Sequence, residues 1–96
     1  AKKVERSGAF SIVLECISEL TAKTITKNLK IPTIGIGSSN VCDGQILVTD
    51  DLLGLSGFYP KFVKKYANLE RLIDKAIKKY SREVKYKKFP TNKNSF

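Results

Sequence analysis

Glu15 is the residue best suited to chemistry, because it closes a short apolar run in a chain that contains no histidine. The run from Phe10 to Glu15 (FSIVLE) predicts a buried strand. A carboxylate at the carboxyl end of a parallel strand lies where α/β proteins place catalytic groups. Apolar neighbours would partly desolvate it and make it a stronger base, able to remove a proton. The alternative is a strand-end glutamate that pairs with a surface lysine.

Apolar residues of three strands are expected to surround this carboxylate. They are Val13, Ile36, Ile46 and Val48. Strand alternation puts Ser11 and Val13 on the same side as Glu15. Ile36, Ile46 and Val48 would then be candidate substrate-binding residues, although ordinary core packing explains them equally well.

Other kinds of site find little support. Without histidine there is no Ser–His or Cys–His nucleophile, and Gly35 and Gly37 lack the third glycine of a dinucleotide-binding loop. Cys16 and Cys42 are far apart and form no metal-binding pattern, so we expect reduced thiols and a cytoplasmic protein, with a disulfide as the alternative. Asp43 with Gly44 is first of all a turn signal, and the adjacent carboxylates of Asp50 and Asp51 would diverge rather than share a metal.

Hydrophobic periodicity predicts an α/β domain with a parallel sheet covered on both faces. Strands are expected near 10–15, 31–37 and 45–48, helices near 18–29, 61–66 and 68–85, and a loosely held basic tail at 86–96. Three strands are too few for such a sheet. Moreover, the connection from Gly37 to Gln45 contains no helix, so it is either an irregular crossover or a sign that these strands are not parallel neighbours.

Length and composition set the limits of function. The 96 residues permit one small domain. The chain contains no methionine and its opening AKKVERSG resembles the end of a helix, so we expect a piece of a longer protein. No apolar stretch approaches the roughly 20 residues of a membrane span.

The net charge of +9 raises nucleic acid as a partner. Lysines dominate this charge and are scattered, whereas arginine occurs only at Arg6, Arg71 and Arg82. A solvated lysine-rich surface is the simpler interpretation. The alternative is a basic module that binds nucleic acid through Lys61, Lys64, Lys65, Lys78 and Lys79.

Several linked blocks resemble the ketopantoate hydroxymethyltransferase (3-methyl-2-oxobutanoate hydroxymethyltransferase) family in order and spacing. They are GAFSIVLE, IPTIGIG, CDGQILV, a DxLG turn and PKFVKKY, and the closing FP and NSF resemble the family's ending. The resemblance covers essentially the whole chain and corresponds to the C-terminal portion of these enzymes.

This resemblance implies a (β/α)₈ TIM barrel of the phosphoenolpyruvate/pyruvate type, of which the chain would supply strands six to eight and the C-terminal helices. It implies transfer of a hydroxymethyl group from 5,10-methylenetetrahydrofolate to 3-methyl-2-oxobutanoate, giving 2-dehydropantoate for pantothenate and coenzyme A synthesis. The family's proton-abstracting glutamate falls on Glu15. Its Mg²⁺ ion, which stabilises the enolate, is held by residues on earlier strands, outside this chain. Bacterial members form decamers, which implies a homo-oligomer.

The sequence departs from the family pattern at three places. Gly37-Ser38-Ser39 stands where the family commonly has Gly-Ala-Gly, Asp50-Asp51 replaces a His-Asp pair, and Asn94 replaces a histidine. The contribution of those histidines is therefore in doubt here. We expect the chain by itself to be inactive, and a non-catalytic relic is a further alternative for the whole protein.

Overall fold

The apolar runs form a three-stranded parallel sheet. The computed structural model describes residues 1–96 and orders the strands β1 (Ile12–Glu15), β2 (Thr33–Ile36) and β3 (Gly44–Gln45). Because the strands run in the same direction, their carboxyl ends lie at one edge of the sheet. This edge is where ligands bind in α/β proteins.

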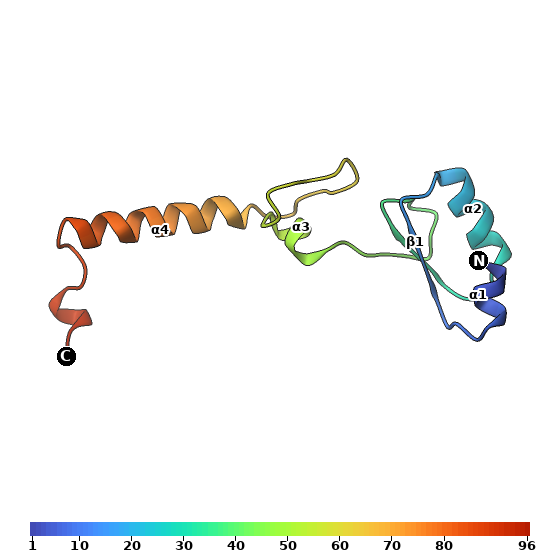
Figure 1. The fold of residues 1–96 in the computed structure, drawn as a ribbon, viewed down its shortest axis with the longest axis horizontal. Coiled ribbons are helices and arrows are strands. Elements are labelled where there is room, and N and C mark those ends of the chain that lie inside the picture. The colour runs from blue at the N-terminus through green and yellow to red at the C-terminus, as the bar shows by residue number, and fades with distance from the viewer.

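Helix α2 (Glu19–Asn28) follows β1 and covers one face of the sheet (Figure 1). It begins where the sequence predicts, because the Ser18 side chain accepts a hydrogen bond from the Thr21 N–H at 3.3 Å. The core between α2 and the sheet is small. Its buried residues are Leu14, Ala22 and Cys42, with Ile12, Ile17, Ile25 and Val41 packed around them.

The connection between β2 and β3 is an irregular crossover of residues 37–43, which decides between the two alternatives left by the sequence. Asp43 holds the end of this crossover beside the start of β2. One oxygen of the Asp43 carboxylate accepts hydrogen bonds from the Thr33 N–H (2.8 Å) and hydroxyl (3.0 Å). Thr33 is fully buried and its hydroxyl also bonds Thr26 of α2 at 2.9 Å. These bonds hold the short connection against β2, although it lacks the helix that usually joins parallel strands.

Residues 61–66 are not helical, so the prediction of a helix there is wrong. The backbone N–H groups of this segment bond elsewhere. The Val63 N–H bonds the Pro60 carbonyl in a turn, and the Tyr66 N–H bonds the Leu52 carbonyl at 2.8 Å. One donor is thus used in a local turn and the other in a tertiary contact, and neither makes the bond to the fourth preceding residue that an α-helix requires.

The third strand is also shorter than the predicted 45–48. It comprises only Gly44–Gln45. The Ile46 N–H still bonds the Gly35 carbonyl at 3.0 Å, after which the chain leaves the sheet and enters α3 (Thr49–Leu53), a helix that the sequence analysis did not predict. Within this chain β3 is an edge strand, with a ladder on one side only.

Helix α4 (Leu69–Lys85) extends away from the sheet, and the short 3₁₀ helix η1 (Asn92–Asn94) follows it (Figure 1). Helix α1 (Lys2–Arg6) lies at the opposite end beside α2. The radius of gyration is 22.2 Å, whereas a compact domain of this size has about 13 Å. The chain is therefore extended, and neither α4 nor the second face of the sheet is covered within it.

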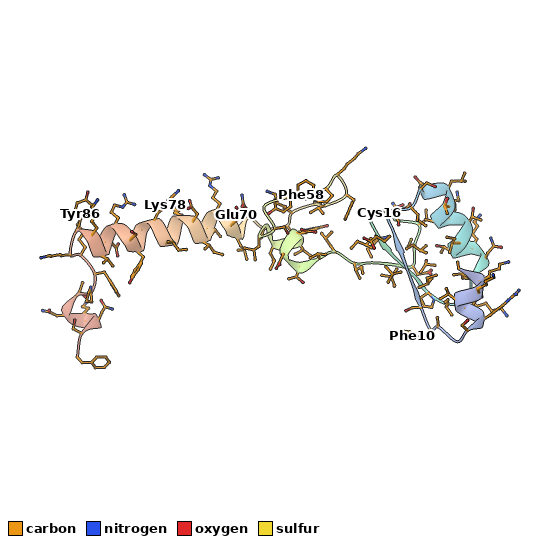
Figure 2. The ribbon with its side chains drawn as sticks, in the orientation of Figure 1. Phe10, Cys16, Phe58, Glu70, Lys78 and Tyr86 are labelled. Atoms are coloured by element: carbon orange, nitrogen blue, oxygen red, sulfur yellow. The ribbon has the colours of Figure 1, made fainter.

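The apolar stripe of α4 faces solvent. Leu72, Ile73, Ile77, Tyr80 and Val84 are between 44% and 60% exposed, and Figure 2 shows side chains projecting outward along most of this helix. At its C-terminal end the Tyr80 ring contacts that of Phe89, with 5.7 Å between the ring centres. An amphipathic helix buries such a stripe in a folded domain. The chain has no helix long and apolar enough to cross a membrane.

Candidate active site

Glu15 is the last residue of β1 and lies on the face of the sheet opposite α2. Successive strand residues point to opposite faces. Leu14 packs against α2 and is 5% exposed, whereas Val13 is 53% exposed and Glu15 is also exposed. The face that carries Glu15 is therefore the one that α2 leaves uncovered.

Of the four apolar residues expected around Glu15, Val13, Ile36 and Ile46 lie on its face of the sheet and Val48 does not. Glu15 pairs with Ile36 in the register of β1 and β2. Gln45 pairs with Gly35, which places Ile46 next to Ile36 on the same face. Glu15, Ile36 and Ile46 therefore form a row across the sheet at its carboxyl edge, with about 10 Å between the backbones of its two ends. Val48 lies beyond the row, as the residue before α3.

The backbone on both sides of Glu15 is held in place by hydrogen bonds. The Ser38 hydroxyl donates to the Leu14 carbonyl at 2.6 Å and accepts from the Ile17 N–H at 3.4 Å. The Cys16 N–H donates to the Ile36 carbonyl at 2.9 Å, and Cys16 itself has a φ of 51°. Such a left-handed turn directly after the strand is strained in a residue other than glycine. The bonds fix the direction in which the strand end presents Glu15.

The role of Ser38 was missed from the sequence, where it was noted only as a departure from the family pattern. A serine two residues after a strand most often bonds its own loop. Here its partners are 21 and 24 residues away in the chain, a pairing that only the register of the two strands creates.

The remaining carboxylates do not gather into a metal site. Asp43 lies at the opposite edge of the sheet from Glu15, at the start of β3. Asp50 and Asp51 lie in the first turn of α3, where their charge is favourable at the positive end of the helix, and Asp51 accepts a hydrogen bond from Ser56. No three His, Cys, Asp or Glu side chains lie close enough together to bind a metal ion. The residues of this chain therefore do not fit a Mg²⁺ site.

Asp43 has a structural environment. The hydrogen bond from the Thr33 N–H, and then that from the Thr33 hydroxyl, lower the pKa of the Asp43 carboxyl below its ordinary value of 3.8. Both bonds favour the charged form because they donate to it. Their position at the amino edge of the strands is the side of an α/β fold that serves stability.

Both cysteines are free thiols. Cys42 is buried in the core under α2, and Cys16 is exposed beside Glu15 at the strand end (Figure 2).

Four of the five lysines considered for nucleic acid contact a carboxylate or an aromatic ring of this chain. Lys78 pairs with Asp74 at 2.8 Å and Lys79 with Glu83 at 3.8 Å, both along α4. The ammonium of Lys65 lies over the Tyr59 ring and that of Lys64 over the Tyr66 ring. Such pairing is typical of solvated lysines rather than of a groove that follows a phosphate backbone.

Comparison with known proteins decides the family. The model of the ketopantoate hydroxymethyltransferase family matches residues 1–92. The chain belongs to this family. Three relatives carry the name 3-methyl-2-oxobutanoate hydroxymethyltransferase and align with 100% of the chain: 53% identity in Pelagibacter ubique, 56% in Thermotoga maritima and 55% in Enterococcus faecalis.

The chain spans only about a third of these relatives. The aligned part is 37% of the Pelagibacter protein, 36% of the Thermotoga protein and 35% of the Enterococcus protein. The exposed face of the sheet and the exposed stripe of α4 agree with a part of a larger ketopantoate hydroxymethyltransferase fold. The mixed α/β architecture with a small parallel sheet is likewise consistent with part of a barrel.

Proposed function

We propose that the protein to which this chain belongs transfers a hydroxymethyl group to 3-methyl-2-oxobutanoate, with Glu15 as the base that removes the proton from C3. Family membership and the names of the relatives support the reaction. The observation that carries the role of Glu15 is its place in the row with Ile36 and Ile46, at the carboxyl edge and opposite α2.

The proposed reaction begins when Glu15 takes the proton from C3, next to the keto group. Water releases the one-carbon unit of 5,10-methylenetetrahydrofolate as formaldehyde, and the two C–N bonds that break return their electron pairs to tetrahydrofolate, whose nitrogens take the protons of the water. The electron pair of the C3–H bond then forms a C–C bond with the formaldehyde carbon, the formaldehyde oxygen takes a proton and becomes the hydroxyl group, and the product is 2-dehydropantoate. A C–H beside a ketone is a far weaker acid than a carboxylic acid, so the carboxylate must be held in contact with it. The bonds made by Ser38 and Cys16 give Glu15 that fixed position.

Ile36 is proposed to contact the isopropyl group of the keto acid. It is the nearest apolar residue to Glu15 across the sheet, and Ile46 follows on the next strand. A branched apolar group lying over these side chains would exclude water from the proton that Glu15 removes. Val48, outside the row, would contact the substrate only at its far end.

We also propose that β1, β2 and β3 are strands six to eight of a (β/α)₈ barrel. The parallel order, the helix on one face and the polar strand end on the other are what such a barrel requires. The Mg²⁺ ligands implied by the family resemblance are assigned to the parts of the relatives that this chain does not cover, because the chain has no suitable cluster.

The test is Glu15→Gln in the complete protein, since the substitution keeps the size of the side chain and removes the base. We expect hydroxymethyl transfer to fall by about 10²- to 10⁴-fold. Exchange of the C3 hydrogen of 3-methyl-2-oxobutanoate for deuterium in D₂O, followed by NMR without folate, should fall equally.

Glu19→Gln is the matched control, because Glu19 is an exposed glutamate in the first turn of α2. It should leave both rates within about twofold of the wild type, as surface substitutions usually do. Exchange that persists at the wild-type rate in the Glu15→Gln protein would exclude Glu15 as the base.

A further inference from the structure

A loop of residues 53–66 lies next to the carboxyl edge of the sheet. Its two ends are joined, because the Leu52 carbonyl accepts hydrogen bonds from the N–H groups of Tyr66 (2.8 Å) and Ala67 (3.3 Å). Gly54 sits against the backbone of Ala67 with no room for a side chain. A segment of this length with its ends together is an Ω-loop, a kind of loop that is often functional.

The Ω-loop touches the sheet through Phe62. The Phe62 ring packs on Gly37, where an added Cβ would lie only 2.8 Å from the ring. Gly37 directly follows Ile36, the neighbour of Glu15. In Figure 1 the far end of this loop, between α3 and α4, approaches the end of the sheet. The loop therefore borders the candidate active site.

A pocket of about 380 Å³ opens between the Ω-loop and the sheet edge. Most of its lining is apolar, and its polar side chains are those of Gln45, Lys64 and the Tyr66 hydroxyl; the lining residues are Gly37, Gln45, Ile46, Leu47, Leu52, Phe62, Lys64 and Tyr66. The volume is in the range of small-molecule sites, which combine apolar surface with a few polar groups. Ile46 lines this pocket and also belongs to the row that contains Glu15, so the pocket borders the end of that row.

The charge in the pocket is a single cation. The Lys64 ammonium lies 5.0 Å from the centre of the Tyr66 ring and has no carboxylate within 4.0 Å. An aromatic face next to an unpaired ammonium suits a ligand that joins a flat aromatic ring to a carboxylate.

We propose that this pocket binds the p-aminobenzoyl-glutamate part of the tetrahydrofolate cosubstrate, an inference that rests on the proposed function. The benzoyl ring lies between Phe62 and Tyr66, and a glutamate carboxylate binds the Lys64 ammonium. The keto acid then occupies the space over Ile36 beside Glu15, with the one-carbon unit between the two.

Lys64→Gln in the complete protein tests the proposal. We expect the KM for 5,10-methylenetetrahydrofolate to rise about tenfold, the effect of losing one charged hydrogen bond. The KM for 3-methyl-2-oxobutanoate and the folate-independent C3 deuterium exchange should not change. Lys65→Gln is the matched control, because Lys65 is the next residue and its ammonium lies over Tyr59, outside the pocket. A rise of equal size in both variants, or a rise in the KM for the keto acid, would overturn the proposal.

The aromatic contribution is tested with Phe62→Leu against Phe58→Leu, since Phe58 is an exposed aromatic of the same loop (Figure 2). Only Phe62→Leu should raise the folate KM. Equal effects would also contradict the assignment.

Direct binding separates this inference from the proposed function. p-Aminobenzoyl-L-glutamate, followed by calorimetry, should bind the wild type and Glu15→Gln equally and Lys64→Gln about tenfold more weakly. If Glu15→Gln kept the wild-type rate of C3 exchange, the role of Glu15 as the base would be refuted. The binding of p-aminobenzoyl-L-glutamate would still test the pocket. Equal binding by wild type and Lys64→Gln would refute the pocket even if transfer activity is present.

Discussion

Gly37→Ala offers the sharpest structural test of the Ω-loop's position. Gly37 has a φ of 61°, and a residue with a Cβ costs about 1–2 kcal/mol in this left-handed region. The new Cβ would also meet three atoms of the Phe62 ring at 2.8, 2.9 and 3.1 Å. Normal carbon contacts are about 3.5–4.0 Å, so the ring must move by most of an ångström. Overpacking of this kind costs about 1–3 kcal/mol.

The two contributions can be separated by a double-mutant cycle in the complete protein. With Phe62 present, Gly37→Ala should lower the free energy of unfolding by about 2–5 kcal/mol, the sum of both effects. In a Phe62→Ala background only the backbone strain remains, about 1–2 kcal/mol. Urea denaturation of the four proteins gives these values. The folate KM should rise in the single Gly37→Ala variant, because the displaced ring is a wall of the pocket.

An equal cost of Gly37→Ala in both backgrounds would refute the contact between Phe62 and Gly37, and with it the placement of the Ω-loop against the sheet. A cost below about 1 kcal/mol in either background would show that the backbone at this position is not left-handed.

Three further predictions concern the frame around the site. Ser38→Ala should lower the free energy of unfolding of the complete protein by about 1–2 kcal/mol through the lost bond to Leu14, and should lower C3 exchange by less than Glu15→Gln does, because the bond from the Cys16 N–H to the Ile36 carbonyl still holds the strand end; a loss comparable to that of Glu15→Gln would contradict this. The lowered pKa of Asp43 means that its bonds to Thr33 contribute stability above pH 3.8 that is lost as the pH falls through the lower, folded-state pKa; Asp43→Asn should thus be less stable near pH 7, with a difference from the wild type that shrinks on acidification. Residues 1–96 by themselves should self-associate with rising concentration in light scattering, because the stripe of α4 and the sheet face are exposed; a monomer with a sharp, reversible thermal transition would be contrary evidence.

The local parts of the fold could be predicted because their causes are local. The run ending at Glu15 is apolar and partly β-branched, Ser18 is a good helix N-cap, and the apolar residues of α4 recur at three and four residues. The helix predicted at 61–66 is absent for a reason that lies outside its own sequence. Its Lys and Tyr residues have adequate helix propensity, but the N–H groups bond Leu52 and Pro60 instead.

The site was predictable only in part, for the same reason. Alternation along each strand placed Glu15 and Val13 on one face. Nothing in the sequence fixes the register between strands, which decides that Ile36 and Ile46 stand beside Glu15 whereas Val48 does not. The Ω-loop and Ser38 depend on that register too, so their part in the site emerges only from the tertiary structure.

Glu15 and the apolar residues on its face of the sheet are exposed for the same reason, because no element of this chain covers that face. A carboxylate surrounded by water is a weak base toward carbon, and Glu15 is exposed in this chain. Val13, two residues before Glu15 on the same face, is 53% exposed, although valine is usually buried. Burying it contributes about 25 cal/mol for each Å² removed from water, and a surface that covers Val13 would also shield Glu15. Closure of the proposed barrel would therefore be driven by the apolar residues and would activate the base as a consequence. Val13→Asp should accordingly lower both the free energy of unfolding of the complete protein and its rate of C3 exchange. If the Val13→Asp protein folded as stably as the wild type but lost exchange, the activation of Glu15 would have another cause.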